Sequence, residues 1–289
     1  MRQSIRWSVI LAIALLAGHG MATDSSQAAE SNPLLREVQN TEEYFPDGIG
    51  SVWRYVGHTH TETIERIADV AFQNEVATIG TSNMHGVTVK IFRETNQGNK
   101  GASDGFFRRD KAGIVYYGSQ PTTPFEQQLV PYRILNFPLM LGATFQQLNK
   151  TNVDMQADLD GDGHPEHGTV VANAQIVGYE PVTVPAGTFP DALRIDAVMT
   201  ISVTLTKSGH LAVSQDRITS WFVRGVGLVK YVETIEAPRV LETRGEITYM
   251  SEELESYTIK GMVNGAPTPT LSPHLSGLSA APIVRHPSF

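Results

Sequence analysis

The sequence predicts an all-β protein, a curved antiparallel meander forming a half-barrel or barrel-like sheet with one or two short helices. From residue 44 onward, short runs of β-branched and aromatic residues are separated by Gly, Asn, Asp and Pro, the pattern of strands and turns. Long helical periodicity is absent, and the best helix candidate, residues 125–135, is interrupted by Pro131. The runs follow one another closely, which favours antiparallel neighbours because a parallel pair needs a long crossover.

The clearest strand is residues 193–205. Apolar side chains stand at every second position from Leu193 to Leu205, with polar side chains between them, and Val198 alone departs from this order. The alternation predicts one buried face and one wet face. A shorter alternation sets Val89 on the apolar face of its strand and Lys90 on the polar face.

Further strand-like runs predict a sheet of about ten strands, which tends to curl, split into layers or close. These runs are residues 52–56, 114–117, 170–177, 221–223, 228–232 and 247–250. Between two of the strands, residues 184–187 read Val-Pro-Ala-Gly, with Pro and Gly at the positions that a type I turn prefers. A barrel, half-barrel or sandwich is therefore expected.

The amino terminus has the pattern of a secretory signal. Arg2 and Arg6 precede an apolar centre at residues 9–16, which gives way to small and polar residues at 18–20. This run is shorter than the roughly twenty residues that a membrane span needs. We therefore expect residues 1–28 to be a signal peptide, cleaved after Ala22 or Ala28, rather than an uncleaved anchor. The mature protein is then periplasmic or secreted, with no stable membrane span.

The rest of the chain divides into three parts. Residues 29–43 form a polar leader in which residues 34–38 favour one or two helical turns. Residues 44–260 form a single antiparallel β domain. Residues 261–289 are rich in Pro, Ser, Thr, Ala and Gly, so they bury little apolar surface and are predicted to be a disordered tail.

Charge and cysteine content narrow the function further. The net charge is −8, and loss of Arg2 and Arg6 with the signal makes the remainder more acidic. Nucleic acid is not expected as a partner, because phosphate backbones require clustered Lys and Arg. The chain has no cysteine, which excludes disulfides and a lipid-modified amino-terminal cysteine.

One acidic segment, residues 158–166, predicts a calcium loop. Carboxylates at alternate positions followed by a Gly match the first half of an EF-hand loop. Position twelve is Thr169, so the bidentate Glu of a full EF-hand is missing, and we compare the segment with short, weak calcium loops of extracellular modules, in which the ion is structural. The alternative is a polar surface turn. The predicted ligands are the side chains of Asp158, Asp160 and Asp162, the backbone carbonyl of His164, and the Glu166 carboxylate directly or through water.

Other candidate sites are weaker. His58 and His60 lie two apart on a predicted strand and face the same side, as zinc ligands can, but no third ligand has a convincing spacing. A solvated strand face is the preferred interpretation. No catalytic residue is predicted.

Aromatic residues are expected mainly in the core. If the sheet curls, a few of them are expected to line an apolar cavity instead. The candidates are Trp53, Tyr55, Phe72, Trp221 and Phe222.

Three segments carry a family resemblance. Residues 44–55 combine an aromatic-Pro start with a Gly-x-x-Trp-x-Tyr strand, residues 178–189 read Gly-Tyr-Glu-Pro-Val-Thr-Val-Pro-Ala-Gly-Thr-Phe, and residues 221–230 join a Trp-aromatic strand to a Gly-Val-Gly turn. In sequence and order they resemble the TapB-like exported bacterial proteins. The resemblance implies a curved sheet akin to the LolA/LolB half-barrel carriers and brings no catalytic residues. Residues 95–165 and the tail depart from it.

These observations favour an exported, non-enzymatic protein whose curved sheet binds or shields an apolar ligand, such as a lipid or acyl chain, and which carries a structural calcium ion. One alternative is a structural or interaction module of the cell envelope, with another envelope protein as its partner and no small-molecule ligand. The least supported alternative is a metal-dependent hydrolase using the acidic loop.

Overall fold

The protein is described here from a computed structural model, which covers residues 35–95, 102–237 and 245–261. The predicted signal peptide, residues 1–28, lies outside the described residues. So do the first residues of the leader and the predicted tail from residue 262.

A single antiparallel sheet dominates the described residues, as predicted. It has 12 strands in the order β6-β5-β4-β3-β2-β1-β12-β11-β10-β9-β8-β7, so almost every strand pairs with its neighbour in the chain. The strands are β1 (Val52–Glu62), β2 (Ile67–Met84), β3 (Val87–Glu94), β4 (Ser103–Asp110), β5 (Gly113–Gln120), β6 (Tyr132–Asn136), β7 (Thr144–Asp154), β8 (His167–Val184), β9 (Gly187–Thr204), β10 (Leu211–Val223), β11 (Gly227–Ala237) and β12 (Glu246–Thr258).

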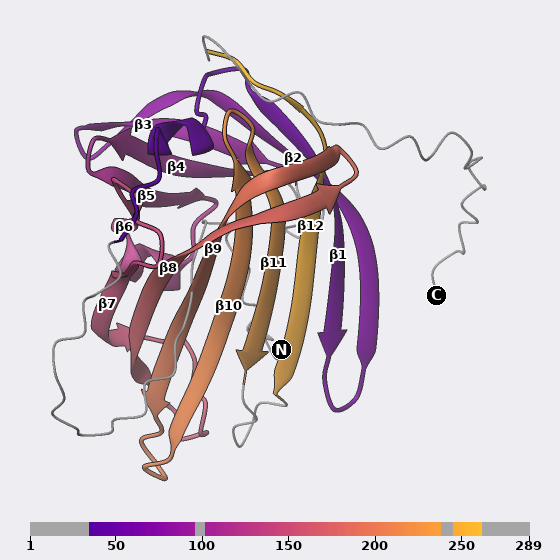
Figure 1. The fold of residues 1–289 in the computed structure, drawn as a ribbon. Coiled ribbons are helices and arrows are strands. Elements are labelled where there is room, and N and C mark those ends of the chain that lie inside the picture. The colour runs from indigo at the N-terminus through magenta and orange to yellow at the C-terminus, as the bar shows by residue number, and fades with distance from the viewer. Residues whose placement is uncertain (1–34, 96–101, 238–244, 262–289) are drawn as a thin grey trace, which may run out of the picture.

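The sheet curls into a nearly closed barrel (Figure 1). Its two edge strands, β6 and β7, lie beside each other without a ladder of backbone hydrogen bonds. A side chain bridges them instead, because Gln147 Nε2 donates to the Ile134 carbonyl at 2.7 Å. The bond satisfies a buried backbone acceptor at the seam of the barrel.

The strand expected at residues 193–205 is confirmed as the main part of β9. Leu193 and Ile195 are fully buried on its inner face, as the alternation predicts. Val198, which departed from the pattern, is also buried. The turn expected at 184–187 joins β8 to β9, with Val184 paired to Gly187, whose φ of 139° few other residues adopt.

The helix expected within residues 125–135 occupies only the first half of that stretch, as α1 (Pro124–Leu129). Thr123 caps it, its hydroxyl accepting from the Glu126 amide at 3.1 Å, and Pro124 suits the first turn. The chain leaves the helix before Pro131 and continues as strand β6. No helix in the described ranges has the length and apolar character to cross a membrane.

Part of the predicted leader packs in the core. Val38 is 1% exposed, and its amide donates to the Leu139 carbonyl at 2.8 Å. Glu37 forms an isolated β-bridge with Met140, so the helical turn predicted at 34–38 is absent from its described part. A short 3₁₀ helix, η1 (Thr41–Tyr44), follows and leads the chain to the mouth of the pocket described next.

Candidate ligand pocket and candidate metal loop

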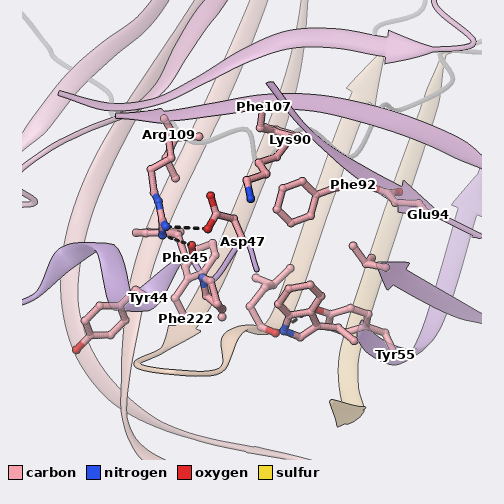
Figure 2. A pocket seen from close by; sticks show the side chains of 16 residues that line it. Tyr44, Phe45, Asp47, Tyr55, Lys90, Phe92, Glu94, Phe107, Arg109 and Phe222 are labelled. Atoms are coloured by element: carbon pink, nitrogen blue, oxygen red, sulfur yellow. Dashed lines mark hydrogen bonds and ion pairs between the residues drawn. The ribbon is translucent and has the colours of Figure 1, made fainter. Parts of the chain in front are cut away.

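An apolar pocket of about 120 Å³ opens between the segment before β1 and the inner face of the sheet (Figure 2). Residues from the segment before β1, from β1 to β5 and from β10 and β11 line it. Aromatic rings make up much of the wall, and Phe92 meets Phe107 edge to face with ring centres 5.4 Å apart. The other aromatic lining residues are Tyr44, Phe45, Trp53, Tyr55 and Phe222.

Hydrogen bonds fix two of these rings. The Trp53 indole N–H donates to the Val226 carbonyl at 2.6 Å, and the Tyr55 hydroxyl donates to the Leu228 carbonyl at 3.0 Å. Both bonds join β1 to the β10–β11 turn and the start of β11. Their polar atoms are thereby satisfied, which leaves ring faces to form the wall. The expectation that a curled sheet places some aromatics at a cavity thus holds for Trp53, Tyr55 and Phe222.

The other two aromatic candidates lie elsewhere. Phe72 packs across Gly57, where a Cβ would come within 2.3 Å of the Phe72 ring, so any side chain at that position of β1 would require the ring to move. Trp221 donates its indole N–H to Glu180 at 2.5 Å and lies 5.9 Å from the Arg194 guanidinium. Neither ring lines the pocket.

Four charged residues line this mainly apolar pocket. Arg109 pairs with Asp47 at 2.7 Å and donates to the Phe45 carbonyl at 2.6 Å, which fixes the guanidinium at one side of the mouth. Lys90 and Glu94 both come from β3 and lie on either side of Phe92 along the strand (Figure 2). Lys90 was expected on the wet face of its strand. The structure corrects this, because the face with Lys90, Phe92 and Glu94 turns toward the pocket.

Carboxyl groups are also buried inside the barrel, both in the pocket wall and beyond it. Burial raises the pKa of Glu252 to about 7, although Asn74, which donates to both of its oxygens at 3.2 Å, opposes the shift. Burial likewise raises the pKa of Asp216 to about 6, and burial with the nearby Asp216 carboxylate raises the pKa of Glu233 well above its ordinary value. Burial, and then Glu252, raise the pKa of Glu94 well above its ordinary value. The inner face is therefore less negative than its composition suggests.

The acidic loop connects β7 to β8, and the structure brings its carboxylates together. One oxygen from each of Asp158, Asp160, Asp162 and Glu166 lies within 4.8 Å of the others. Four carboxylate oxygens at such spacing suit a hard cation such as Ca²⁺, which takes six to eight oxygen ligands. His164 belongs to the same loop with an exposed side chain, and its predicted ligand atom is the backbone carbonyl.

Asp158 organises the loop. Its carboxylate accepts hydrogen bonds from the amides of Gly161, Asp162 and Gly163 at 2.7, 3.2 and 2.9 Å. These amides, that of Gly163 most, lower the pKa of Asp158 and keep it ionised. Gly161 and Gly163 have φ angles of 74° and 93°, which explains the two glycines in the motif.

Two loop carboxylates are buried, and each has one oxygen without a hydrogen-bond partner among the described residues. Asp160 and Glu166 are each 2% exposed. Asp160 Oδ2 accepts from the Lys207 amide at 2.7 Å, and Glu166 Oε2 accepts from the Leu159 amide at 2.5 Å. Asp160 Oδ1 and Glu166 Oε1 have no hydrogen-bond partner among the described residues. Because buried carboxylate oxygens are costly to leave unpaired, both are suited to a cation.

Thr169, at position twelve of the loop, is part of β8. Glu166 is therefore the last loop carboxylate in the group that converges. The loop resembles half of an EF-hand closed by a strand, rather than a loop between two helices.

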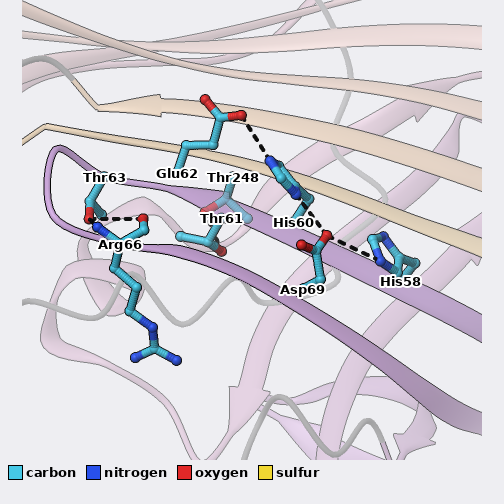
Figure 3. A network of polar contacts seen from close by, with 8 residues as sticks. All are labelled: His58, His60, Thr61, Glu62, Thr63, Arg66, Asp69 and Thr248. Carbon is cyan, nitrogen blue, oxygen red and sulfur yellow. Dashed lines mark hydrogen bonds and ion pairs between the residues drawn. The ribbon is translucent and has the colours of Figure 1, made fainter.

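His58 and His60 lie on the same side of β1, as predicted, and share Asp69 on β2 (Figure 3). His60 bonds to Asp69 at 2.7 Å and to Glu62 at 2.9 Å, while His58 lies 3.5 Å from Asp69. The hydrogen bond to Asp69, followed by that to Glu62, raises the pKa of His60. Among the described residues, only the acidic loop groups its carboxylates and imidazoles closely enough to hold an ion by the same distance criterion. The geometry favours a surface ion-pair network over a zinc site.

Comparisons with known proteins add little about function. No protein family matches the sequence, and no curated protein matches it either. Two solved structures are similar over 74% of this chain and 98% of their own length. One is described as a lipoprotein from Parabacteroides distasonis and has 14% sequence identity and a TM-score of 0.33. The other is described as an exported protein with a YmcC-like fold from Bacteroides fragilis and has 12% sequence identity and a TM-score of 0.34. The TapB-like resemblance stays a prediction.

Proposed function

We propose that this protein is exported, to the periplasm or beyond the cell, and binds an apolar ligand such as a lipid or acyl chain in its barrel pocket without catalysing a reaction. The observation that carries the proposal is the pocket itself. Its rings present apolar faces to an opening, and the polar atoms of Trp53 and Tyr55 are directed to backbone carbonyls. Ligand sites in proteins are mostly apolar concavities with a few placed polar groups, and this pocket has that composition.

The packing of the rest of the barrel supports a pocket at this place. Leu193, Ile195 and Ala197 fill the neighbouring interior at β9 and are fully buried. The interior next to the pocket is therefore filled by the protein's own side chains. Open apolar space lined by aromatic rings contributes nothing comparable to stability, which favours a ligand as its occupant.

We propose that calcium bound at the acidic loop is structural. The support is the pair of buried, unpartnered oxygens on Asp160 and Glu166 within a group of four carboxylates. Asp160 also bonds to the Lys207 amide in the β9–β10 loop, so an ion there would stabilise two neighbouring connections.

The second candidate function, an interaction module of the cell envelope, has one observation in its favour. Apolar side chains are exposed around the β1–β2 hairpin, where Ile64 and Ile67 are each 67% exposed and Val70 is 54% exposed. Exposed apolar groups mark interaction surfaces when they are contiguous. This candidate predicts association with a partner protein and no saturable binding of a small apolar probe.

Displacement of an environment-sensitive apolar fluorophore tests the pocket. The wild-type protein should bind the fluorophore saturably and release it to an alkyl competitor. Val76→Phe, which adds a ring to the wall of the pocket, should reduce binding at least about tenfold, since overpacking is costly. Val70→Phe is the matched control, the same change at an exposed position of the same strand, and should bind like wild type. Equal loss in both variants, or no saturable binding in wild type, would reject the proposal.

A further inference from the structure

The charges around the pocket are not balanced. Of its four charged lining residues, Arg109 and Asp47 form a mutual ion pair at 2.7 Å. Arg109 also donates to the carbonyls of Glu42 and Phe45, at 3.0 and 2.6 Å. This pair is therefore internally neutral and engaged in holding the segment before β1 to the end of β4. The net charge of the pocket therefore depends on the two other charged lining residues, Lys90 and Glu94.

Glu94 contributes little negative charge. It is 9% exposed, and its Oε2 has no hydrogen-bond partner among the described residues. Burial, followed by the Glu252 carboxylate, raises its pKa well above the ordinary value. A neutral carboxyl group is the stable form at such a place. Glu94 then offers a hydrogen bond inside the pocket but no formal charge.

The positive charge of Lys90 is not balanced by an ion pair. It lies half-buried in the pocket wall, and none of the ion pairs among the described residues includes it. It stands four residues before Glu94 on β3, which separates their Cα atoms by about 13 Å along the strand. Phe92 lies between them on the same face. The amphipathic Lys90 side chain thus places apolar methylenes against the wall and an unpaired ammonium beside it.

We propose that the pocket selects single-chain amphiphiles with an anionic head group, such as an alkyl carboxylate, and that Lys90 binds the head while the aromatic wall binds the chain. This inference rests on the proposed function and specifies its ligand class. Charge complementarity supports it: the pocket carries one uncompensated positive group next to a strip of ring surface. An ammonium and a carboxylate form a charge-assisted hydrogen bond, which is strengthened beside an apolar wall.

A ligand with a cationic head group is the alternative, and Glu94 is the residue that would bind it. A cationic head group, such as an alkylamine, would pair with Glu94 after that carboxyl loses its proton. The ammonium of Lys90 on the same face of β3 opposes this. The anionic ligand requires no such deprotonation.

Decanoate, decanol and decylamine, each below its micelle concentration, should be compared as competitors of the bound fluorophore. They share one chain and differ in head-group charge. Wild type should bind decanoate about tenfold more tightly than decanol, and decylamine no more tightly than decanol. Lys90→Gln should reduce decanoate to the affinity of decanol without changing decanol itself. Lys90→Arg should keep the preference.

One control variant outside the pocket and one variant of the pocket wall complete the test. Lys230→Gln removes a strand lysine outside the pocket, where Lys230 pairs with Glu253 at 2.6 Å, and should leave all three affinities unchanged. Glu94→Gln keeps a neutral side chain and should preserve the preference for decanoate. Thermal midpoints near that of wild type confirm that each variant is folded.

Each contrary outcome has a distinct meaning. Equal affinity for the three competitors, unaffected by Lys90→Gln, would overturn the head-group proposal and leave the apolar pocket in place. A preference for decylamine that Glu94→Gln abolishes would overturn it in favour of a cationic ligand. Failure of all three to displace the fluorophore would overturn both this inference and the proposed function.

Discussion

The indole N–H of Trp53 donates to the backbone carbonyl of Val226 at 2.6 Å, across 173 residues of sequence. This bond joins β1 to the turn between β10 and β11. Both residues belong to a buried cluster that also includes Val182 and Phe189 of β8 and β9. The three segments on which the predicted TapB-like resemblance rests, residues 44–55, 178–189 and 221–230, therefore meet in one place. Their role there is to pack and to position the rings of the pocket wall.

Replacement of Trp53 tests how much this junction stabilises the barrel. Trp53→Phe leaves the buried Val226 carbonyl without its donor, and we expect a loss of about 1–3 kcal/mol in the free energy of unfolding. Trp221→Phe is the comparison, because that indole N–H bonds to the partly exposed Glu180 carboxylate, which can turn to water instead. Denaturant titrations should rank Trp53→Phe as the more damaging change. Equal losses would show that the Trp53–Val226 bond has no special weight.

Calcium should stabilise the folded protein through the acidic loop. At a hundredfold excess over the dissociation constant, a single site adds about 2.7 kcal/mol. In a domain of this size, each kcal/mol of added stability raises the thermal midpoint by about 2–4 °C. The midpoint should therefore rise between excess chelator and saturating calcium.

Asp160→Asn should abolish the calcium effect while keeping an acceptor for the Lys207 amide. Asp191→Asn, at an exposed position of β9 outside the loop, is the matched control and should respond like wild type. A midpoint that is indifferent to calcium in the wild-type protein would leave residues 158–166 as a polar turn.

Glu252 should make stability depend on pH. A glutamate in the unfolded chain has a pKa near 4.5, whereas that of buried Glu252 is about 7. Between these values the folded state binds more protons than the unfolded state, so the free energy of unfolding falls as pH rises. The fall is at most about 1.4 kcal/mol per pH unit and ends above the folded pKa.

Glu252→Gln should flatten this decline between about pH 5 and pH 7, with the difference from wild type largest at the upper end. Glu255→Gln, at an exposed position of the same strand, should keep the wild-type slope. Denaturant titrations across this range supply the measurement. A wild-type slope retained in Glu252→Gln would assign the pH dependence to other buried carboxyls, such as Glu233.

Much of the fold follows from local pattern. Alternation at residues 193–205 identified β9 and its inner face, and Pro185 with Gly187 identified the hairpin before it. In the acidic loop, Asp158, Asp160 and Asp162 lie close together in the structure, while calcium binding there stays a prediction. These features depend on neighbours in sequence, which is where periodicity and turn chemistry carry information.

For the pocket, the sequence predicts only that some aromatic residues line an apolar cavity. Alternation places Lys90 on a wet face, because a lysine in a strand is most often solvated, and it assigns no role to Phe92 or Glu94. Their common face becomes an inner wall only when β3 curls toward the segment before β1, a contact between distant residues. The run Lys-x-Phe-x-Glu, with period two, was the available signal. Local pattern does not reveal the burial of Val38 either, since its partner Leu139 lies far along the chain.

Calorimetric titration of the wild-type protein with decanoate at several temperatures tests the central claim most directly. We expect one ligand per chain and a negative heat-capacity change, the mark of apolar surface leaving water. Val76→Phe should lose the binding heat and Val70→Phe should retain it. A heat that is absent, or that is the same in Val76→Phe as in wild type, would contradict the account of this barrel as a carrier of an apolar ligand.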